Sequence, residues 1–505
     1  MSDTKQRLFP HKWLWVITAV VLCALFAFAM IPGAAAQGRL EALSGALTQT
    51  QSQRYISSIQ SVFDFILRNY IDEVDPRVLF EGAMNGMLNA LGDPNTAFLS
   101  ESDMRGMTDT TQGRFGGVGL NIIKPPAPRP DGRPSWVEVV SPIEGTPGWR
   151  AGINPGDFIA EINGEPTEDM SMEEVLNRLR GTPGEDVQLL IRRGEIMEIP
   201  LTVTRAIIEV PTVRYAMIGD IGFLRVLTFT PMTPNRVRDA INMFAANNYT
   251  GLVLDLRDNF GGLLNAAVQV SELFLDGGLV VRTTSRIPSE NRNFYANRRN
   301  KLVPADIPVV VLINRASASG SEIVAGALKD RGRAFLVGEN TFGKGSVQQV
   351  IPLERAGFRI TTARYLTPSD ADIDRIGIPP DREIRRFPEI TDEDAINLNE
   401  LNNANRIPEF IRENPEATRA QIEAFAGILE RKYNLSAQLL QFMIRNEQTR
   451  RTGGPPVYDL EHDVQLQEAV NILQSGIFPA LMENFRTLRE IQDEAETAAE
   501  LPIAS

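Results

Sequence analysis

Apolar residues recur at helical spacing in the first part of the chain. Two such runs lie on either side of Asp75-Pro76, and the second ends near Gly92-Asp93-Pro94. Because positions i, i+3, i+4 and i+7 share one face of a helix, the pattern predicts a helical region over residues 37–111. The apolar positions of the two runs are Ile59, Phe63, Ile66 and Tyr70, then Leu79, Ala83, Met87 and Leu91.

The pattern changes between residues 112 and 205 to short apolar runs separated by glycines, which is typical of strands joined by tight turns. One helix is expected to interrupt these strands. Ser171 with Glu174 forms a capping-box pattern at its start, and Val175 and Leu179 follow at helical spacing. The stretch is therefore predicted to be a small β domain with one helix.

Strand-like and helix-like segments alternate over residues 206–386. Buried strands are expected at 252–256, 309–313 and 334–338, with helices between them. The alternation indicates a multi-domain α/β fold. Residues 387–505 are acidic and helix-favouring, so they are expected to form a helical C-terminal region that packs on the core or offers a partner surface.

The first 36 residues have the pattern of an export signal. Basic residues precede an apolar run over 13–31, and Ala34-Ala35-Ala36 follows where a small-x-small cleavage signal is expected. The run is nearly long enough to span a bilayer. We expect export, with cleavage after Ala36 or retention of residues 1–36 as a membrane anchor.

Composition argues against several kinds of chemistry. The 505 residues include 64 acidic and 51 basic side chains and no basic stripe with aromatics, so no nucleic-acid partner is expected. Cys23 is the only cysteine and lies in the export segment, which excludes a thiol nucleophile in the mature chain. His11 and His462 are the only histidines, so neither a Ser-His-Asp triad nor a histidine-ligated zinc is expected.

Residues 314–321 combine small residues and serines between an expected strand and an expected helix. Such a turn can expose a serine beside backbone N–H groups and a helix N-terminus, which suits an acyl-transfer nucleophile. The same composition also suits a simple helix cap. The stretch by itself does not choose among Ser317, Ser319 and Ser321.

Lys344 lies in a glycine-rich turn that begins at Gly338. The turn differs from a phosphate-binding loop, because Gly345 stands where the magnesium-binding hydroxyl is required and Val347-Gln-Gln-Val-Ile is strand-like. A lysine can act as a base near neutral pH when burial lowers its pKa. In a chain with a candidate serine and no suitable histidine, Lys344 is a candidate base, although a surface lysine in a turn is the ordinary alternative.

A diglycine follows the strand expected at residues 252–256, in the stretch Asp255-Leu-Arg-Asp-Asn-Phe-Gly-Gly. Adjacent glycines let backbone N–H groups approach a substrate carbonyl closely. Gly261 or Gly262 is therefore a candidate oxyanion donor. An ordinary strand-to-helix turn explains the same pair without any catalytic role.

Together these stretches resemble the C-terminal processing peptidases, also called tail-specific proteases, over roughly residues 55–385. Ser319-Gly-Ser-Glu-Ile resembles the family's S-A-S-E-I segment, with Gly320 in place of alanine, and Thr341-Phe-Gly-Lys-Gly-Ser-Val-Gln resembles its T-F-G-K-G-x-V-Q segment. Further matches are the Asp255 stretch, Tyr365-Leu-Thr-Pro-Ser with Gly377-Ile-Pro-Pro-Asp, and Leu91-Gly-Asp-Pro-Asn-Thr-Ala-Phe-Leu.

The resemblance implies a Ser/Lys serine endopeptidase whose residues 206–386 form a ClpP/crotonase-like α/β core, without a metal or cofactor. The separation of serine and lysine in the family selects one serine of the three. The implied catalytic residues are Ser319 as nucleophile, Lys344 as base and Gln348 as the residue that positions the lysine, and the implied oxyanion-hole residues are Gly320 with Gly261 or Gly262.

By the same resemblance, residues 112–205 are similar to a PDZ domain. Its glycine loop can present backbone N–H groups to a terminal carboxylate, and the next strand and the helix from Ser171 can flank an extended peptide. Glycines that serve only hairpin turns are the alternative. The expected peptide-binding residues are Phe115, Gly116, Gly117, Val118, Gly119 and Leu120.

The resemblance thus predicts a protease of the bacterial periplasm, or of the periplasmic face of the inner membrane, that captures substrate C-termini and cleaves near them. It implies protein and peptide substrates, homo-oligomers and a helical-repeat adaptor protein, with residues 387–505 as the candidate contact region. Two alternatives stay open. One is a catalytically silent PDZ scaffold, and the other is a nucleotide-binding switch at residues 338–344.

Overall fold

The structure is a computed structural model, and its chain divides into two compact units, Met1–Gly92 and Asp93–Ser505. The predicted export segment lies outside the described residues. In the described part of the chain, no helix is both long and apolar enough to cross a bilayer. The structure describes residues 51–101, 103–104, 106–107, 113–124, 134–194, 197–354, 356–386, 390–451 and 457–500.

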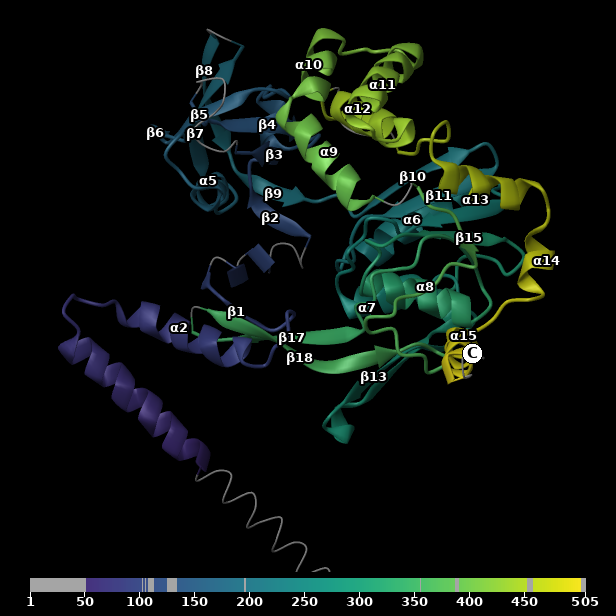
Figure 1. The fold of residues 1–505 in the computed structure, drawn as a ribbon, viewed down its shortest axis with the longest axis horizontal. Helices are drawn as coiled ribbons and strands as arrows, with labels where there is room; N and C mark the ends of the chain where they lie inside the picture. The colour runs from purple at the N-terminus through teal and green to yellow at the C-terminus, as the bar shows by residue number, and fades with distance from the viewer. Residues whose placement is uncertain are drawn as a thin grey trace, which may run out of the picture. The chain divides into compact units, whose positions relative to one another are not determined.

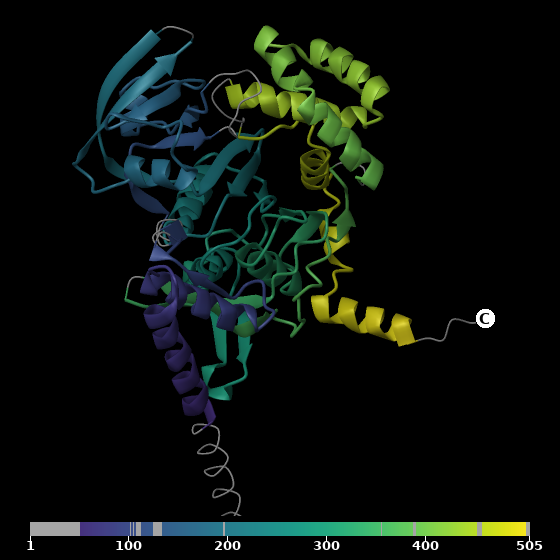
Figure 2. The same cartoon turned by 60° about the vertical axis from the view of Figure 1, so that its left-hand side comes forward.

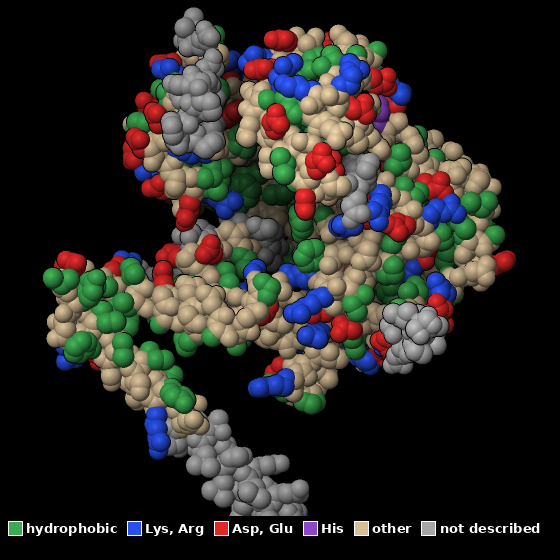
Figure 3. All heavy atoms as spheres, viewed as in Figure 1, with side chains coloured by type: hydrophobic (Ala, Val, Ile, Leu, Met, Phe, Trp, Pro, Cys, Tyr) green, Lys and Arg blue, Asp and Glu red, His purple; other side chains and the backbone are tan. Residues whose placement is uncertain are grey.

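The described part of the first unit is helical, as predicted. Residues 51–69 are helical, and α2 (Pro76–Asn89) follows. The Asp75 carboxylate accepts a hydrogen bond from the Arg77 N–H at 2.9 Å, and Pro76 occupies the first turn, where its missing N–H leaves no bond unmade. Hydrophobic side chains gather on this unit in Figure 3, and the exposed ones include Tyr55, Ile56, Ile59, Val62, Phe65, Tyr70 and Ile71.

The predicted small β domain is present. Its helix α5 (Met172–Leu179) begins with the predicted capping box: the Ser171 N–H donates to Glu174 Oε2 at 2.7 Å, and the Glu174 N–H donates to Ser171 Oγ at 3.2 Å. The described strands of its main sheet lie in the order β3-β4-β5-β7-β8, with β6 beside β5, and β2 pairs separately with β9. The elements are β2 (Arg114–Gly117), β3 (Leu120–Ile123), β4 (Val137–Pro142), α4 (Pro147–Arg150), β5 (Phe158–Ile162), β6 (Glu165–Pro166), β7 (Asp186–Arg193), β8 (Met197–Thr204) and β9 (Ala206–Glu209).

A six-stranded sheet of described residues forms the centre of the next domain, in the order β10-β11-β12-β15-β16-β19. Neighbouring strands are parallel except for β10 and β11. Every residue of β12, β15 and β16 is buried, which is typical of parallel strands covered on both faces. The strands are β10 (Val213–Ile218), β11 (Ile221–Val226), β12 (Gly251–Asp255), β15 (Val309–Ile313), β16 (Phe335–Gly338) and β19 (Arg382–Glu383).

Helices cover both faces of this sheet (Figure 1). Leu252 and Leu254 pack with α6 (Thr233–Ala246), α7 (Leu264–Glu272) and α8 (Gly320–Asp330), whereas Val253 packs in a second cluster with α13 (Val464–Gln474). The alternation follows from the two-residue period of a strand. The predicted α/β fold is therefore confirmed.

A second sheet adjoins this core through the elements that carry the lysine turn. Its described strands lie in the order β1-β18-β13-β14, with β17 paired to β18. The turn that contains Lys344 connects β16 to β17, so a strand follows the lysine as predicted. The elements are β1 (Ala97–Leu99), β13 (Gly278–Ser285), η1 (Pro288–Glu290), β14 (Arg292–Ala296), η2 (Arg298–Asn300), β17 (Ser346–Pro352) and β18 (Gly357–Leu366).

The C-terminal region is helical, as predicted, and has two parts (Figures 1 and 2). Helices α9 to α12 share a hydrophobic cluster of their own that includes Leu401, Ile411 and Leu440. The later helix α13 instead covers the central sheet. The predicted domain boundary at residue 386 therefore divides α13 from the strands that this helix buries. The remaining elements are α9 (Asp392–Asn403), α10 (Arg406–Glu413), α11 (Arg419–Tyr433), α12 (Ala437–Arg451), α14 (Phe478–Met482) and α15 (Leu488–Glu500).

Candidate active site

Ser319 stands at the N-terminus of α8, in the turn that follows β15. Its φ of +53° is uncommon for a residue other than glycine, and such strained backbones concentrate at functional sites. The neighbouring serines are buried and hydrogen-bonded: Ser317 Oγ donates to the Leu256 carbonyl at 2.9 Å, and Ser321 Oγ donates to the Asn259 carbonyl at 2.8 Å. Ser319, in contrast, lines a cavity.

This cavity has a volume of about 690 Å³ and brings the two candidate reactive groups together. Ser319 and Lys344 both line it, as do Gln348 and Gly262. Much of the remaining wall is apolar, so the cavity suits an apolar substrate side chain. The apolar lining includes Phe229, Phe260, Leu263, Ile323, Val347 and Val350.

Tyr365 contacts the serine directly. Its hydroxyl lies 3.0 Å from Ser319 Oγ, within hydrogen-bonding distance. Burial raises the pKa of Tyr365 to about 12, against the opposing effect of this hydrogen bond, so the phenol stays protonated at neutral pH. Sequence reasoning matched the segment that begins at Tyr365 to a family motif but gave this side chain no role.

Lys344 Nζ has no hydrogen-bond partner among the residues that the structure describes, and it is not hydrogen-bonded to Ser319. Burial lowers the pKa of Lys344, and the positive charge of Arg359 lowers it further, whereas Asp93 and Glu322 oppose these effects. The net direction is toward a neutral amine, which is the form that can accept a proton. The serine and the lysine therefore share a cavity rather than a hydrogen bond.

Glu322 joins the serine turn to the lysine turn. This carboxylate is fully buried on α8 and accepts hydrogen bonds from the N–H groups of Ser319 at 2.8 Å and Lys344 at 2.9 Å. Gly343 N–H and Thr341 Oγ also donate to it, at 2.7 and 2.6 Å. Burial raises the pKa of Glu322 although these hydrogen bonds oppose the rise. Two features of the sequence point to this residue: it belongs to the segment Ser319-Gly-Ser-Glu-Ile that resembles the family motif, and it stands three residues after Ser319, as in a capping box.

Gln348 lies on β17 in the same cavity. Its amide nitrogen donates to Ser346 Oγ at 2.8 Å and to Thr361 Oγ at 3.4 Å. Thr361 Oγ in turn donates to Asp93 Oδ2 at 2.6 Å. The predicted contact between Gln348 and Lys344 is thus not a hydrogen bond in this structure.

The two glycines that the sequence left open differ in their hydrogen bonds. Gly261 N–H donates to Asn259 Oδ1 at 2.9 Å, whereas the N–H groups of Gly262 and Gly320 donate to no described residue. A Cβ atom on Gly261 would stand 2.7 Å from the Ala318 carbonyl oxygen, so the diglycine packs directly against the serine turn. Gly262 also lines the cavity, so of the two glycines it is the better placed candidate for an oxyanion donor.

The predicted peptide site of the small β domain divides between a strand and a loop. Strand β2, which pairs with β9, contains Phe115, Gly116 and Gly117. The loop between β2 and β3 therefore consists only of Val118 and Gly119. Leu120 begins β3. This strand is an edge of the described sheet, since it pairs only with β4 there, and such an edge can add a peptide strand.

Comparisons with known proteins agree with this architecture. Residues 220–384 match the profile of peptidase family S41, residues 138–193 match a PDZ domain, and residues 20–102 match the profile described as the activating protease CtpB N-terminal domain. The chain thus combines a peptidase domain with a PDZ domain.

Individual relatives show to which family the chain belongs. The chain is 38% identical over 339 residues to a carboxy-terminal-processing protease of Bartonella bacilliformis, covering 66% of this chain and 76% of that protein. It is 31% identical over 378 residues to carboxy-terminal processing protease CtpA of Bacillus subtilis, covering 74% of this chain and 77% of that protein. A solved structure of a photosystem II D1 C-terminal processing protease is 31% identical, with a TM-score of 0.40, over 66% of this chain and 93% of that one. The chain belongs to the carboxy-terminal processing proteases of peptidase family S41.

Proposed function

We propose that this chain is an exported serine endopeptidase that captures the C-termini of substrate proteins with its PDZ domain and cleaves near them, with Ser319 as nucleophile and Lys344 as general base. The main support is that one cavity holds both side chains while Glu322 accepts hydrogen bonds from the backbone of both. A single buried carboxylate thereby fixes the spacing of the two turns.

In the proposed acylation step, Ser319 Oγ forms a bond to the scissile carbonyl carbon and its proton passes to neutral Lys344. The carbonyl oxygen becomes an oxyanion, and the N–H groups of Gly320 and Gly262 donate to it. Lys344 then gives the proton to the leaving amine as the C–N bond breaks. In deacylation, Lys344 takes a proton from a water that attacks the ester carbon, and it gives this proton to Ser319 Oγ as the acyl C–O bond breaks and the new C-terminal carboxylate leaves.

The contacts around the two side chains suit this sequence of steps. A protonated Tyr365 can donate to Ser319 Oγ, which leaves the serine proton available for Lys344. Lys344 Nζ is bonded to no described residue, so turning toward Ser319 breaks no hydrogen bond in the described structure. We propose that Gln348 holds the lysine in that reactive position.

The PDZ domain supplies the proposed capture site. An extended peptide can pair with the edge of β3 that has no described partner strand, with its carboxylate at the N–H groups near Gly119. Leu120 of β3 packs against the hydrophobic cluster that includes Val175 and Leu179 of α5. The cavity's apolar lining favours an apolar side chain beside the scissile bond. Substrates are therefore proposed to be envelope proteins or peptides with accessible, rather apolar C-termini.

A substrate pair tests this capture directly. We expect a disordered peptide with a free C-terminus to be cleaved by the purified full chain with a kcat/KM about tenfold or more above that of the same peptide amidated at its C-terminus. The reason is that amidation removes charge-assisted hydrogen bonds worth about 1.5–3 kcal/mol. Rates and cleavage positions are read by mass spectrometry. Equal kcat/KM values for the two peptides would contradict capture by the terminal carboxylate.

We further propose that the chain acts in the bacterial periplasm or on the periplasmic face of the inner membrane. The charge and apolar pattern of residues 1–36 supports export and also allows anchoring. The exposed apolar side chains of residues 55–71 support assembly into oligomers, because such stripes commonly mark protein interfaces. Helices α9 to α12 are the proposed contact region for a helical-repeat adaptor protein.

A further inference from the structure

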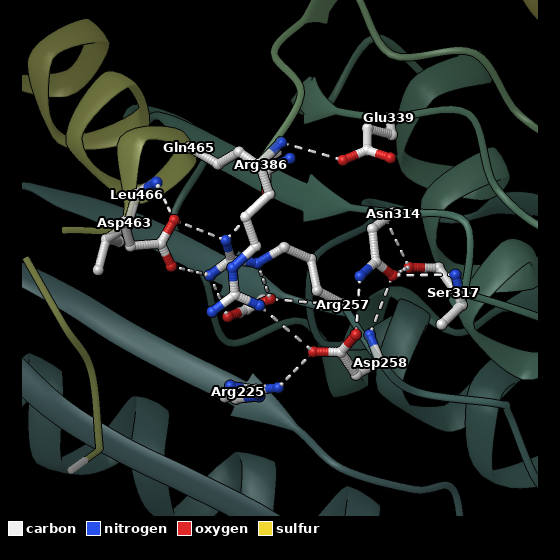
Figure 4. Close-up of polar contacts among 12 residues, drawn as sticks. Arg225, Arg257, Asp258, Asn314, Ser317, Glu339, Arg386, Asp463, Gln465 and Leu466 are labelled. Atoms are coloured by element: carbon white, nitrogen blue, oxygen red, sulfur yellow. Dashed lines mark hydrogen bonds and ion pairs between the residues drawn. The ribbon is translucent and has the colours of Figure 1, made fainter. Parts of the chain in front are cut away.

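A buried arginine, Arg257, connects the C-terminal region to the end of β12 (Figure 4). Arg257 Nε and Nη2 donate to the two carboxylate oxygens of Asp255, at 2.8 and 2.7 Å. On its other side, Nη1 donates to Asp463 Oδ1 at 2.8 Å and to Gln465 Oε1 at 2.9 Å. Because a buried guanidinium needs its donors satisfied, Asp463 and Gln465 complete a network that the central domain leaves unfinished.

The residues after Arg257 form the loop that carries the proposed oxyanion donor, residues 258–262. Asp258 N–H donates to Asn314 Oδ1 at 3.0 Å, and Asn314 Nδ2 donates back to Asp258 Oδ1 at 2.8 Å. The Ala318 N–H donates to the Asn259 carbonyl at 3.0 Å. The first residues of the loop are therefore fixed both to the serine turn and, through the adjacent Arg257, to the C-terminal region.

The charges that surround Asp463 keep it ionised. Burial raises the pKa of Asp463, but the charge and hydrogen bonds of Arg257, the Leu466 N–H and the charge of Arg386 outweigh burial, so its pKa lies below the ordinary value. The same carboxylate caps α13, since it accepts from the Leu466 N–H at 3.1 Å. One side chain thus starts the helix and fills the buried ion network.

We propose that Asp463 is a positioning residue for the cleavage reaction: by pairing with Arg257 it holds loop 258–262, and with it the Gly262 N–H, where the oxyanion forms. This inference rests on the proposed function. It assigns part of the C-terminal region to the active site itself. Asp463 acts through Arg257 and touches no substrate.

Asp463→Asn tests the proposal, because asparagine caps a helix as well as aspartate does and removes only the charge. We expect kcat for peptide cleavage to fall about tenfold with KM within about twofold of wild type, since the oxyanion interaction is made only in the transition state. The melting temperature should also fall, because a buried ion pair is broken. A kcat equal to that of wild type would overturn the proposal, whatever the melting temperature.

Glu468→Gln is the matched control. Glu468 lies on the same helix and forms an ion pair with Arg382 at β19, away from loop 258–262. This variant should lower the melting temperature while leaving kcat unchanged, and an equal fall of kcat in both variants would overturn a specific role for Asp463. If Asp463→Asn does not fold, Gln465→Leu replaces it as the test variant. We expect its kcat to fall two- to fivefold, which corresponds to roughly 0.4–1 kcal/mol in the activation barrier. An unchanged kcat would contradict the proposal. Absence of cleavage by the wild-type chain would instead contradict the proposed function.

Discussion

Ser319→Ala is expected to abolish cleavage of an unfolded protein substrate, with kcat/KM falling about 10⁴-fold or more. The variant removes the only side-chain oxygen of the three neighbouring serines that lines the cavity. The loss should appear in kcat, because substrate capture by the PDZ domain does not use this hydroxyl. Initial rates of fragment formation, read by mass spectrometry with purified full chain, measure it.

Ser321→Ala provides the control for this variant. Its hydroxyl donates to the Asn259 carbonyl, which keeps its hydrogen bond from the Ala318 N–H when this hydroxyl is removed. The variant should therefore lower the free energy of unfolding by about 1 kcal/mol while most of the activity stays. Unchanged cleavage by Ser319→Ala would contradict the nucleophile assignment. Absence of cleavage by every version of the chain, with normal peptide binding, would favour the alternative of a catalytically silent PDZ scaffold.

Lys344→Met is expected to lower kcat by about 10³-fold, within the range of roughly 10²–10⁴ attributed to a general base. Methionine keeps an unbranched apolar stem in the cavity but cannot accept a proton. The variant should bind peptides with wild-type affinity. A kcat within about threefold of wild type would show that another group activates the serine.

The pH dependence of kcat/KM shows whether Lys344 acts in its neutral, proton-accepting form. The wild-type rate should rise with pH as Lys344 loses its proton, with a midpoint below the ordinary lysine pKa, because burial and the charge of Arg359 both lower that pKa. Arg359→Gln removes a positive charge and should move the midpoint to higher pH. Lys344→Met should lose the titration altogether. A profile unchanged in both variants would contradict the assignment of the titrating group.

The local features of the fold could be predicted from the sequence because they depend on neighbouring residues. The capping box at Ser171 and Glu174 depends on residues three positions apart, and both of its hydrogen bonds are present. The buried strand 309–313 and the helix after it follow from an apolar run that ends in small residues. A phosphate-binding loop at Lys344 was disfavoured on the same local grounds, because the residues after it are strand-like, and a strand does follow it.

The contacts that complete the candidate site could not be read from the sequence, because they join residues far apart in the chain. Tyr365 reaches Ser319 only because β18 lines the same cavity, and Glu322 reaches the lysine turn only through the position of α8. The pairing of Asp463 with Arg257 depends on the return of the chain to the central sheet after helices α9 to α12. Asp463 is one of many acidic residues in the helical C-terminal region, and nothing in the sequence around it indicates that its carboxylate is buried.

The most direct test of the serine–lysine pair is the ionisation of a thiol placed at position 319. The only natural cysteine, Cys23, lies in the predicted export segment, far from residue 319 in the sequence, so peptide mapping distinguishes the two thiols of Ser319→Cys. The rate of iodoacetamide alkylation against pH gives the pKa of the new thiol, whose unperturbed value is about 8.5. We expect the addition of Lys344→Met to raise this pKa by about 1 unit or more, because it removes the amine that accepts the thiol proton and then stabilises the thiolate as an ammonium group. An identical pKa with and without Lys344 would contradict the claim that the two side chains act as a pair.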